Sequence, residues 1–165
     1  MALEVVFGNC NCIFVVGNFN FKILQNMTTL LKSATIIDPS SQHHKQIKDI
    51  LIINGKVDKI ANKIQNKPSY KLVELENLHV SCGWFDTSVS LGEPGYEERE
   101  TIQNGLSVAS KSGFTSIALN PNTFPVIDSK SDVEFLINKA SNSATSLYPI
   151  GALTKLSDGK EIAEL

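Results

Sequence analysis

Ser88 and Ser90 lie at the end of an apolar stretch, with a spacing that a bound metal could use. Residues two apart on an extended chain point to the same side, as a pair of ligands on one strand does. The residue types are not those of a metal site. Zinc binds imidazole, thiolate or carboxylate, whereas a serine hydroxyl is a neutral, weak ligand. A serine nucleophile would need a base. The candidate base, His79, stands nine residues before Ser88 on the same predicted strand, and this odd separation puts it on the opposite face.

The other side chains that could bind a metal are not arranged as a site. His43 and His44 are adjacent in a polar loop, so they diverge on an extended chain, and we expect solvated loop histidines. The three cysteines, Cys10, Cys12 and Cys82, lack the two-residue gap of a zinc knuckle or a redox loop. Their odd number argues against a disulfide scaffold and fits a reducing cytoplasm. We therefore predict neither a metal site nor a cofactor site here.

The composition is that of an ordinary globular protein, with 42% hydrophobic and 19% charged residues. A net charge of −2 and a pI near 5.9 create no basic field that would gather nucleic acid or anionic lipid. Neither nucleic acid nor a membrane is an expected partner. The 165 residues suffice for one domain, or for a small domain plus part of a larger one. They are too few for a complete eight-fold barrel, which needs about 250 residues.

Residues 1–26 differ from the rest of the chain, because they are apolar and rich in asparagine. Glu4 stands where a secretory signal would carry basic residues, and the apolar pieces are shorter than the ~18–20 residues of a membrane span. A clean strand pattern starts at Met27-Thr28-Thr29. We therefore expect Met27 to be the natural start and residues 1–26 to be an extension that is not native or is disordered. The functional alternative is a membrane or partner anchor.

Residues 27–77 are predicted to form a small β-sandwich portion. Two β-rich runs flank Asn54-Gly55, which is the strongest short hairpin signal because both central positions of the tight turn need positive φ. Runs of this kind make a small sheet that must pack on something. The predicted strands are 30–37, 49–53, 56–60 and 71–75.

Residues 78–165 alternate strand and helix patterns, which is the signature of βα units around a parallel sheet. The predicted strands begin at Leu78, Phe114 and Ser146, and the last of them extends to Leu153. The chain stops inside the third predicted helix, so we expect roughly three βα units of a barrel and a longer reading frame. The first predicted helix begins with an acidic turn at 97–100, and the second begins with a capping box at Ser131–Glu134. The third predicted helix begins at Asp158.

Two amphipathic stripes and one shaped loop support these units. Ile102, Leu106 and Ala109 fall on one face of the first helix, which ends at Gly113. Two prolines in the loop 120–125 shape the carboxyl end of the second strand, where barrel enzymes hold substrate. The stripe of the second helix consists of Val133, Leu136, Ile137 and Ala140.

The chain from about residue 30 to residue 165 resembles the N-terminal part of dihydroorotase, a cyclic-amide hydrolase of the amidohydrolase superfamily. Several separate blocks in the same order carry the resemblance. It implies pyrimidine biosynthesis and a β-sandwich beside a TIM (β/α)8 barrel with zinc at its mouth. The blocks are Asn54-Gly55-Lys56, His79-Val80-Ser81, Gly83-Trp84-Phe85-Asp86, Glu93-Pro94-Gly95-Tyr96-Glu97, Gly113-Phe114-Thr115-Ser116, Pro121-Asn122-Thr123, Pro125-Val126-Ile127-Asp128 and Tyr148-Pro149-Ile150-Gly151-Ala152.

The chain departs from the pattern of that family at the barrel mouth. The family's first strand ends in Asp-x-His-x-His, whose histidines bind zinc, and an arginine that grips the substrate carboxylate follows. Here Asp86 is retained, but Ser88 and Ser90 stand at the histidine positions and Gly92 at the arginine position. Asn122, which matches the family's second carboxylate-binding residue, is kept as the one predicted substrate-binding residue. The family's remaining ligands and catalytic aspartate lie beyond Leu165.

These departures predict a degenerate, inactive homologue of dihydroorotase, with no catalytic residue and no zinc ligand of its own. One alternative is a non-catalytic assembly partner of aspartate transcarbamoylase, which rests on analogy with members of the family. Another is an active cyclic amidohydrolase whose rebuilt site is completed by residues beyond Leu165. A partial barrel leaves strand edges and apolar helix faces uncovered, so we expect self-association.

Overall fold

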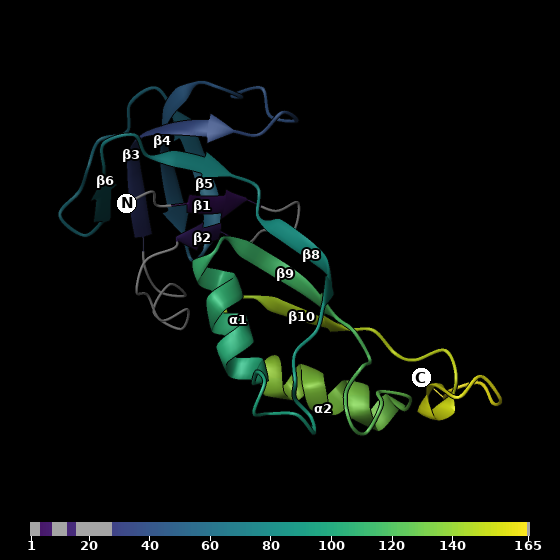
Figure 1. Cartoon of the computed structure of the whole chain (residues 1–165). Coiled ribbons are helices and arrows are strands. Elements are labelled where there is room, and N and C mark those ends of the chain that lie inside the picture. Colours follow the sequence, from purple (N-terminus) through teal and green to yellow (C-terminus); the bar gives the residue numbers. More distant parts are fainter. Residues whose placement is uncertain (1–3, 8–12, 16–27, 165) are drawn as a thin grey trace. The chain divides into compact units, whose positions relative to one another are not determined.

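The computed structural model describes residues 4–7, 13–15 and 28–164 (Figure 1). The chain divides into two compact units, Met1–Gly83 and Trp84–Leu165. The predicted boundary lay between residues 77 and 78. The division falls later because Leu78 and Val80 are buried in the core of the first unit. No helix in the described part of the chain is long and apolar enough to cross a bilayer.

One mixed sheet forms the first unit, in the order β2-β1-β7-β3-β4-β5, with β6 also paired to β3. β3 is its central strand, because it pairs antiparallel with β4 and parallel with β6 and β7. Buried apolar side chains of β3, β4 and β7 form its core. The strands are β1 (Glu4–Phe7), β2 (Ile13–Val15), β3 (Thr28–Ile37), β4 (Ile47–Ile53), β5 (Lys56–Ala61), β6 (Lys71–Glu74) and β7 (His79–Ser81).

The hairpin predicted at Asn54-Gly55 is confirmed. β4 and β5 pair antiparallel on either side of it. Asn54 has a φ of 51° and Gly55 a φ of 76°, the positive values that a tight hairpin turn requires at both central positions. A local signal of two residues therefore sets this part of the sheet.

β1 and β2 lie within the segment predicted to be an extension. β1 pairs in parallel with β7, from Glu4 opposite His79 to Val6 opposite Ser81. The other residues of that segment, Cys10 and Cys12 among them, lie outside the described residues. That residues 1–26 are not native stays a prediction.

A buried carboxylate holds an irregularity in β3. The register of β3 against β4 shifts between Leu31 and Ala34, and Ser33 has a φ of 53°. Asp49 on β4 is only 2% exposed, and its carboxylate accepts the backbone N–H of Ser33 over 3.0 Å and that of Ile64 over 2.8 Å. The same carboxylate forms an ion pair with Lys32. The carboxylate thus satisfies the Ser33 N–H at the register shift, and it also accepts a backbone N–H from the loop that follows β5.

The second unit alternates strands and helices as predicted. Its strands form a parallel sheet in the order β10-β9-β8. Buried residues of both helices pack with strand residues in one apolar core, and the helices lie along the same face of the sheet (Figure 1). The elements are β8 (Trp84–Val89), α1 (Ile102–Lys111), β9 (Phe114–Leu119), α2 (Lys130–Ala140) and β10 (Ser146–Pro149).

The start predicted for the first helix is wrong. α1 begins at Ile102, after an N-cap at Thr101 whose side chain accepts the Asn104 N–H over 3.2 Å. The acidic residues at 97–100 instead belong to turns, because the Tyr96 N–H donates to the Gly92 carbonyl and bends the chain before the helix. The predicted buried stripe is confirmed at Ile102 and at Leu106.

The second helix begins two residues earlier than its predicted capping box. The N-cap is Ser129, whose hydroxyl accepts the Asp132 N–H, while the Asp132 carboxylate accepts the Ser129 N–H. An aspartate therefore fills the position that we assigned to Glu134. Ile137 is 49% exposed, so its place in the buried stripe is wrong, whereas Leu136 is buried as predicted.

The third predicted helix does not form within residues 158–164. A short 3-10 turn, η2 (Lys155–Ser157), precedes them, and Thr154 bridges Ile162. Leu156 has a φ of 52° and Ser157 a φ of 55°, so the chain reverses here, and the Lys155 N–H donates to the Glu161 carbonyl over 2.8 Å. This reversal takes up the backbone groups that a helix would use. The strand predicted to reach Leu153 also ends early, at Pro149.

Candidate functional site

Polar side chains gather where β8 and β9 end, at the carboxyl edge of the parallel sheet of the second unit. Ser88 is the penultimate residue of β8 and Ser90 follows that strand, while Asn120 and Asn122 follow β9. The Asn120 N–H donates to the Val89 carbonyl over 2.8 Å, which extends the pairing of the two strands to this edge. We call Ser88, Ser90, Asn120 and Asn122 the strand-end cluster.

Hydrogen bonds join the strand-end cluster across the two strands. The Asn120 amide nitrogen Nδ2 donates to the Ser88 hydroxyl over 3.1 Å and lies 3.4 Å from the Ser90 hydroxyl. The Asn122 amide nitrogen donates to Ser90 over 2.9 Å. Both serines therefore point to one side, as their spacing predicted. Each serine accepts from an amide where the resemblance implies a zinc ligand.

Asp86 lies beside the cluster, and its carboxylate is used by the backbone. One carboxylate oxygen accepts the Ser88 N–H over 3.0 Å and fixes the conformation of the strand end. A groove of about 370 Å³ extends from here between β8, β9 and α1, and its charged lining residues are Asp86 and Glu100, both acidic. Ser90 lines the same groove, whose other lining residues are Val89, Leu91, Gly105, Val108, Ala109, Ser112, Phe114 and Ile117.

Gly92, where the resemblance implies an arginine, leaves no space for a side chain. A Cβ atom built there would lie 1.9 Å from the Tyr96 carbonyl oxygen and 3.0 Å from that of Glu100. Both backbone groups of Gly92 are bonded within the same loop. Its N–H donates to the Glu100 carbonyl over 3.0 Å, and its carbonyl accepts the Tyr96 N–H over 2.8 Å. An arginine at this position therefore requires a different backbone.

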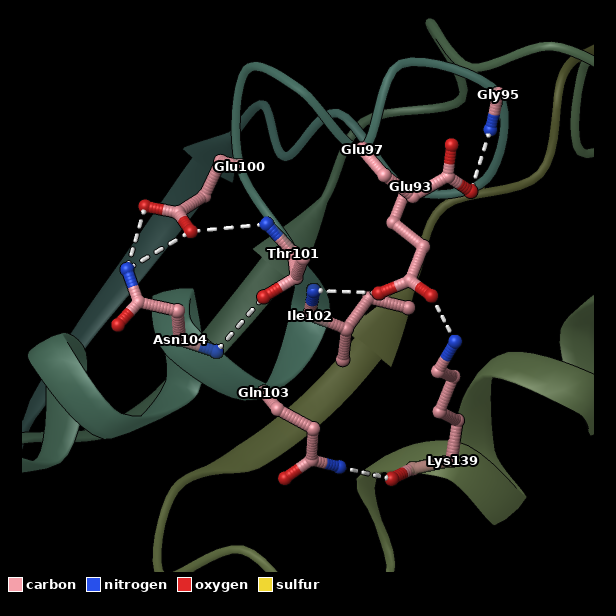
Figure 2. A network of polar contacts seen from close by, with 9 residues as sticks. All are labelled: Glu93, Gly95, Glu97, Glu100, Thr101, Ile102, Gln103, Asn104 and Lys139. Atoms are coloured by element: carbon pink, nitrogen blue, oxygen red, sulfur yellow. Dashed lines mark hydrogen bonds and ion pairs between the residues drawn. The ribbon is translucent and has the colours of Figure 1, made fainter.

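A buried glutamate anchors this loop to both helices (Figure 2). Glu93 is 6% exposed, and one of its carboxylate oxygens accepts the Ile102 N–H at the start of α1 over 2.8 Å. The other carboxylate oxygen forms an ion pair with Lys139 in the last turn of α2. The Gln103 side chain donates to the Lys139 carbonyl over 2.6 Å and adds a second link between the helices. Glu93 thus holds the loop while satisfying a free N–H of the helix terminus.

Two further carboxylates tie the loop to itself and to α1 (Figure 2). Glu97 accepts the Gly95 N–H over 3.0 Å, and this hydrogen bond lowers the pKa of the Glu97 carboxyl. Glu100 accepts the Thr101 N–H over 2.9 Å and the Asn104 side-chain amide over 3.0 Å. The acidic residues that the sequence placed in a helix therefore shape the loop instead.

The loops after β8 and β9 are in direct backbone contact. The Phe124 N–H donates to the Pro94 carbonyl over 3.1 Å. Gly95 has a φ of 93°, and a Cβ built on it would lie 2.0 Å from the Phe124 carbonyl oxygen. Only glycine allows this approach, so the two loops that border the cluster form one connected rim.

The residues present do not fit the zinc that the resemblance implies. In residues 4–7, 13–15 and 28–164, no group of three or more His, Cys, Asp or Glu side chains is placed to hold a metal. The two neutral serines supply no ligand of the kind that zinc takes. His79 is not on the strand of Ser88, because the predicted strand is divided into β7 in the first unit and β8 in the second. His79 therefore does not serve as a base on that strand.

Two of the other candidate ligands, His44 and Cys82, lie in the first unit. His44 accepts the Asp38 N–H through Nδ1 over 3.1 Å, so this loop histidine has a local structural role beyond solvation. Cys82 is an exposed free cysteine. Desolvation and the neighbouring Asp38 carboxylate raise the pKa of its thiol, which is the opposite of what activates a cysteine nucleophile.

Sequence reasoning missed Asn120 and Glu93. The sequence placed Asn120 only in a shaped loop and Glu93 only in one of the blocks that carry the resemblance. Asn120 directly follows a buried strand, which is the position of functional residues in parallel sheets and was an available signal. The burial of Glu93 had no local signal, because its cation, Lys139, is distant in the sequence.

Comparison with known proteins gives a consistent family. The model of the Dihydro-orotase-like family matches residues 79–165. The dihydroorotase of Syntrophus aciditrophicus is 39% identical over 140 residues, which cover 84% of this chain and 33% of the relative. That of Pelotomaculum thermopropionicum is 37% identical over 139 residues, covering 84% and 32%. The chain thus spans about a third of the length of the curated relatives it matches.

A solved structure shows the same fold. The L-hydantoinase (dihydropyrimidinase) of Arthrobacter aurescens superposes with a TM-score of 0.66 at 18% identity, over 76% of this chain and 28% of that protein. This likeness is consistent with the predicted combination of amidohydrolase-type β-sandwich strands and the first βα units of a TIM (β/α)8 barrel. The matches in sequence and in fold agree, and the chain belongs to the dihydroorotase-like family.

Proposed function

We propose that the barrel mouth of this dihydroorotase-like protein does not carry out zinc-dependent hydrolysis of a cyclic amide. The observation that supports this most directly is the pairing of Ser88 with Asn120 and of Ser90 with Asn122. At the positions where the resemblance implies two zinc-binding imidazoles, neutral hydroxyls accept hydrogen bonds from neutral amides. The protein is then a homologue in pyrimidine biosynthesis that has lost catalysis at this site.

The chemistry of amide hydrolysis supports the proposal. An unactivated cyclic amide requires a metal-generated hydroxide, or an activated nucleophile with a stabiliser for the developing oxyanion. A serine route needs a base within hydrogen-bond reach. The hydrogen-bond partners of Ser88 and Ser90 side chains in the described residues are the amides of Asn120 and Asn122, and an amide does not accept a proton at neutral pH.

The carboxylate clamp of the family also has no counterpart at its usual position. Gly92 carries no side chain and leaves space for none. A charged hydrogen bond of this kind contributes roughly 1.5–3 kcal/mol. The alternative is an active cyclic amidohydrolase whose rebuilt site takes ligands from residues beyond Leu165.

The test combines metal analysis with an activity assay on the purified chain. We expect no stoichiometric zinc and no interconversion of dihydroorotate and carbamoyl-aspartate. The same assays are then made on the protein encoded by the complete reading frame around this sequence. Stoichiometric zinc together with measurable turnover in that protein would overturn the proposal and favour the rebuilt site.

Histidines at positions 88 and 90 should give the strand end an affinity for zinc. The double variant Ser88→His/Ser90→His should bind zinc at least tenfold more tightly than the parent chain, because two imidazoles then stand on one side of a strand beside Asp86. Zinc titration with a competing chelator measures the difference. The matched control is Ser141→His/Ser143→His, which has the same spacing in the turn after α2. Equal affinities in the two variants would show that the strand end does not have a ligand geometry.

A further inference from the structure

We propose that the strand-end cluster binds an uncharged group that has both a hydrogen-bond donor and an acceptor, a carboxamide or a urea, and discriminates against a carboxylate. The inference rests on the proposed function, because a zinc-loaded mouth would select its ligand by metal coordination. It adds a ligand preference that the loss of the metal alone does not specify. Three features of the second unit carry it: unused hydrogen-bonding groups, the sign of the local charge and a closed loop at Gly92.

Hydrogen-bonding groups of both kinds remain unused in the cluster. Asn120 and Asn122 donate through Nδ2 to the serine oxygens. Among the described residues, their carbonyl oxygens have no hydrogen-bond partner, and neither do the hydroxyl protons of Ser88 and Ser90. Each serine hydroxyl accepts from an amide and keeps its own proton to donate. The cluster therefore offers acceptors and donors side by side, which a carboxamide or a urea can match with its N–H and C=O groups.

The charges near the cluster disfavour an anion. Asp86 adjoins it through the Ser88 N–H, and the groove that Ser90 lines adds the carboxylate of Glu100. No lysine or arginine is among the lining residues of that groove. A carboxylate would lose water and meet charges of its own sign, whereas a neutral amide loses less on desolvation.

The nearby cations have other partners. Lys139 pairs with the buried Glu93. Arg99 lies 4.4 Å from the centre of the Tyr96 ring and 3.7 Å from Glu98. Among the described contacts, Arg99 of the loop that follows β8 is therefore placed on Tyr96 and Glu98 and not on a residue of the cluster.

The backbone of the loop around Gly92 supports the preference of the cluster for a neutral group over a carboxylate. Gly92 cannot carry a longer side chain unless the Tyr96 carbonyl moves, and Glu93 holds the loop to both helices. Gly95 in the same loop contacts the backbone of Phe124 in the next one. Groups held in place in this way lose little freedom when a ligand binds, which favours the existing geometry over one rebuilt for an anion.

The test uses two ring compounds that differ by one carboxylate. Dihydrouracil and dihydroorotate share the same cyclic ureide, and only dihydroorotate carries a carboxylate. Each is titrated into the 15N-labelled 165-residue chain, and the side-chain amide signals of Asn120 and Asn122 are followed by NMR. We expect dihydrouracil to shift these signals and dihydroorotate to bind at least tenfold more weakly.

Variants separate the cluster from nonspecific binding. Asn122→Ala should weaken dihydrouracil roughly three- to tenfold, as expected for the loss of one neutral hydrogen bond. The matched control Asn138→Ala, on the exposed side of α2, should leave the affinity unchanged. Asp86→Asn removes a charge and should narrow the preference for dihydrouracil over dihydroorotate, which a purely structural role would not do.

Each outcome bears on the inference separately from the proposed function. Dihydroorotate binding as tightly as dihydrouracil, or an absence of shifts at Asn120 and Asn122, overturns the inference even if the protein holds no zinc. Zinc with turnover of dihydroorotate overturns the proposed function itself. Selective binding of dihydrouracil at the cluster in a zinc-free, inactive protein supports both.

Discussion

At the scale of single residues, Gly92 determines most about the barrel mouth. The resemblance implies an arginine at this position, and the glycine found there carries no charge. The structure adds that the loop closes on this residue, with the Tyr96 carbonyl 1.9 Å from where a Cβ would lie. An arginine at this one position therefore requires the loop backbone to move.

Substitution of Gly92 by alanine should be costly. The added Cβ meets backbone atoms, which cannot rotate away, so Gly92→Ala should lower the free energy of unfolding of the second unit by about 2–3 kcal/mol. Denaturation followed by the fluorescence of Trp84, the chain's single tryptophan, measures this unit.

Gly159→Ala is the control for backbone strain. Gly159 has a φ of 77° and nothing within 4 Å of its would-be Cβ, so only about 1 kcal/mol is expected. If Gly92→Ala lowered the free energy of unfolding no more than Gly159→Ala does, the loop around Gly92 would open easily. Arginine could then be accommodated.

Asp49 gives a pH dependence to the first unit. Burial by itself raises the pKa of its carboxyl, but the hydrogen bonds from Lys32 and from the Ser33 and Ile64 N–H groups outweigh this, and the pKa lies below its ordinary 3.8. A carboxyl whose pKa is lowered in the folded state contributes to the free energy of unfolding. The contribution is fully present when the pH is above the pKa of the carboxyl in the unfolded chain. This stability is lost as the pH falls from about 4 through the folded pKa.

Asp49→Asn should therefore destabilise the first unit at pH 7 by about 1–3 kcal/mol and flatten its loss of stability as the pH falls below about 4. Circular dichroism during denaturation at several pH values measures both effects. Asp58→Asn, on the exposed side of β5, should change stability by less than about 0.5 kcal/mol. An unchanged pH profile in Asp49→Asn would show that other carboxylates govern the acid response.

At the scale of secondary structure, the segment between β8 and α1 connects the site to the helices. Glu93 accepts the first N–H of α1 and pairs with a lysine near the end of α2, so one side chain joins three elements. The acidic residues at 97–100, which were predicted to form a first helical turn, belong to this loop. The loop, and not the strand alone, therefore sets the shape of the rim.

Removing the charge of Glu93 should loosen both helices. Glu93→Gln keeps an acceptor for the Ile102 N–H but leaves Lys139 without its carboxylate, and we expect a loss of about 1–3 kcal/mol in the second unit. Amide hydrogen exchange at the start of α1 should become faster.

Glu98→Gln is the matched control, because the ion pair that the described residues give Glu98 is an exposed one with Arg99, and such pairs contribute little. If both variants lost the same stability, the role assigned to Glu93 would be wrong.

At the scale of the whole molecule, the second unit has open borders. β8 and β10 are the outer strands of its sheet. Phe85 and Tyr148, from these two strands, are 54% and 53% exposed, and their ring centres lie 5.8 Å apart. Exposed aromatic residues and free strand edges favour association with another polypeptide.

We therefore expect the 165-residue chain to self-associate in solution. Gel filtration with light scattering should show species larger than the 18.0 kDa monomer. The same column run tests association with aspartate transcarbamoylase, which stays a prediction from the resemblance. A shared peak with that enzyme would support it and separate peaks would remove it. A monomer that melts cooperatively would contradict the expectation of self-association.

The sequence by itself determined the features that depend on neighbours along the chain. Asn54-Gly55 specified a hairpin because its φ requirement is local, and the second strand of the βα units was predicted to begin at Phe114, where β9 begins. The spacing of Ser88 and Ser90 placed them on one side, because side chains alternate along a strand. The motif blocks identified the family, since they are read in order without any folding.

Only the tertiary structure decided what depends on distant partners. It moved the start of α1, because the residues before it bond to Gly92, and it divided one predicted strand between two units, because Val80 is buried in the first. It brought Asn120 to the serines and Lys139 to Glu93, pairs far apart in the sequence. The physical reason is the same in each case: burial and hydrogen bonding between strands and helices override local preference when the partner group comes from elsewhere in the chain.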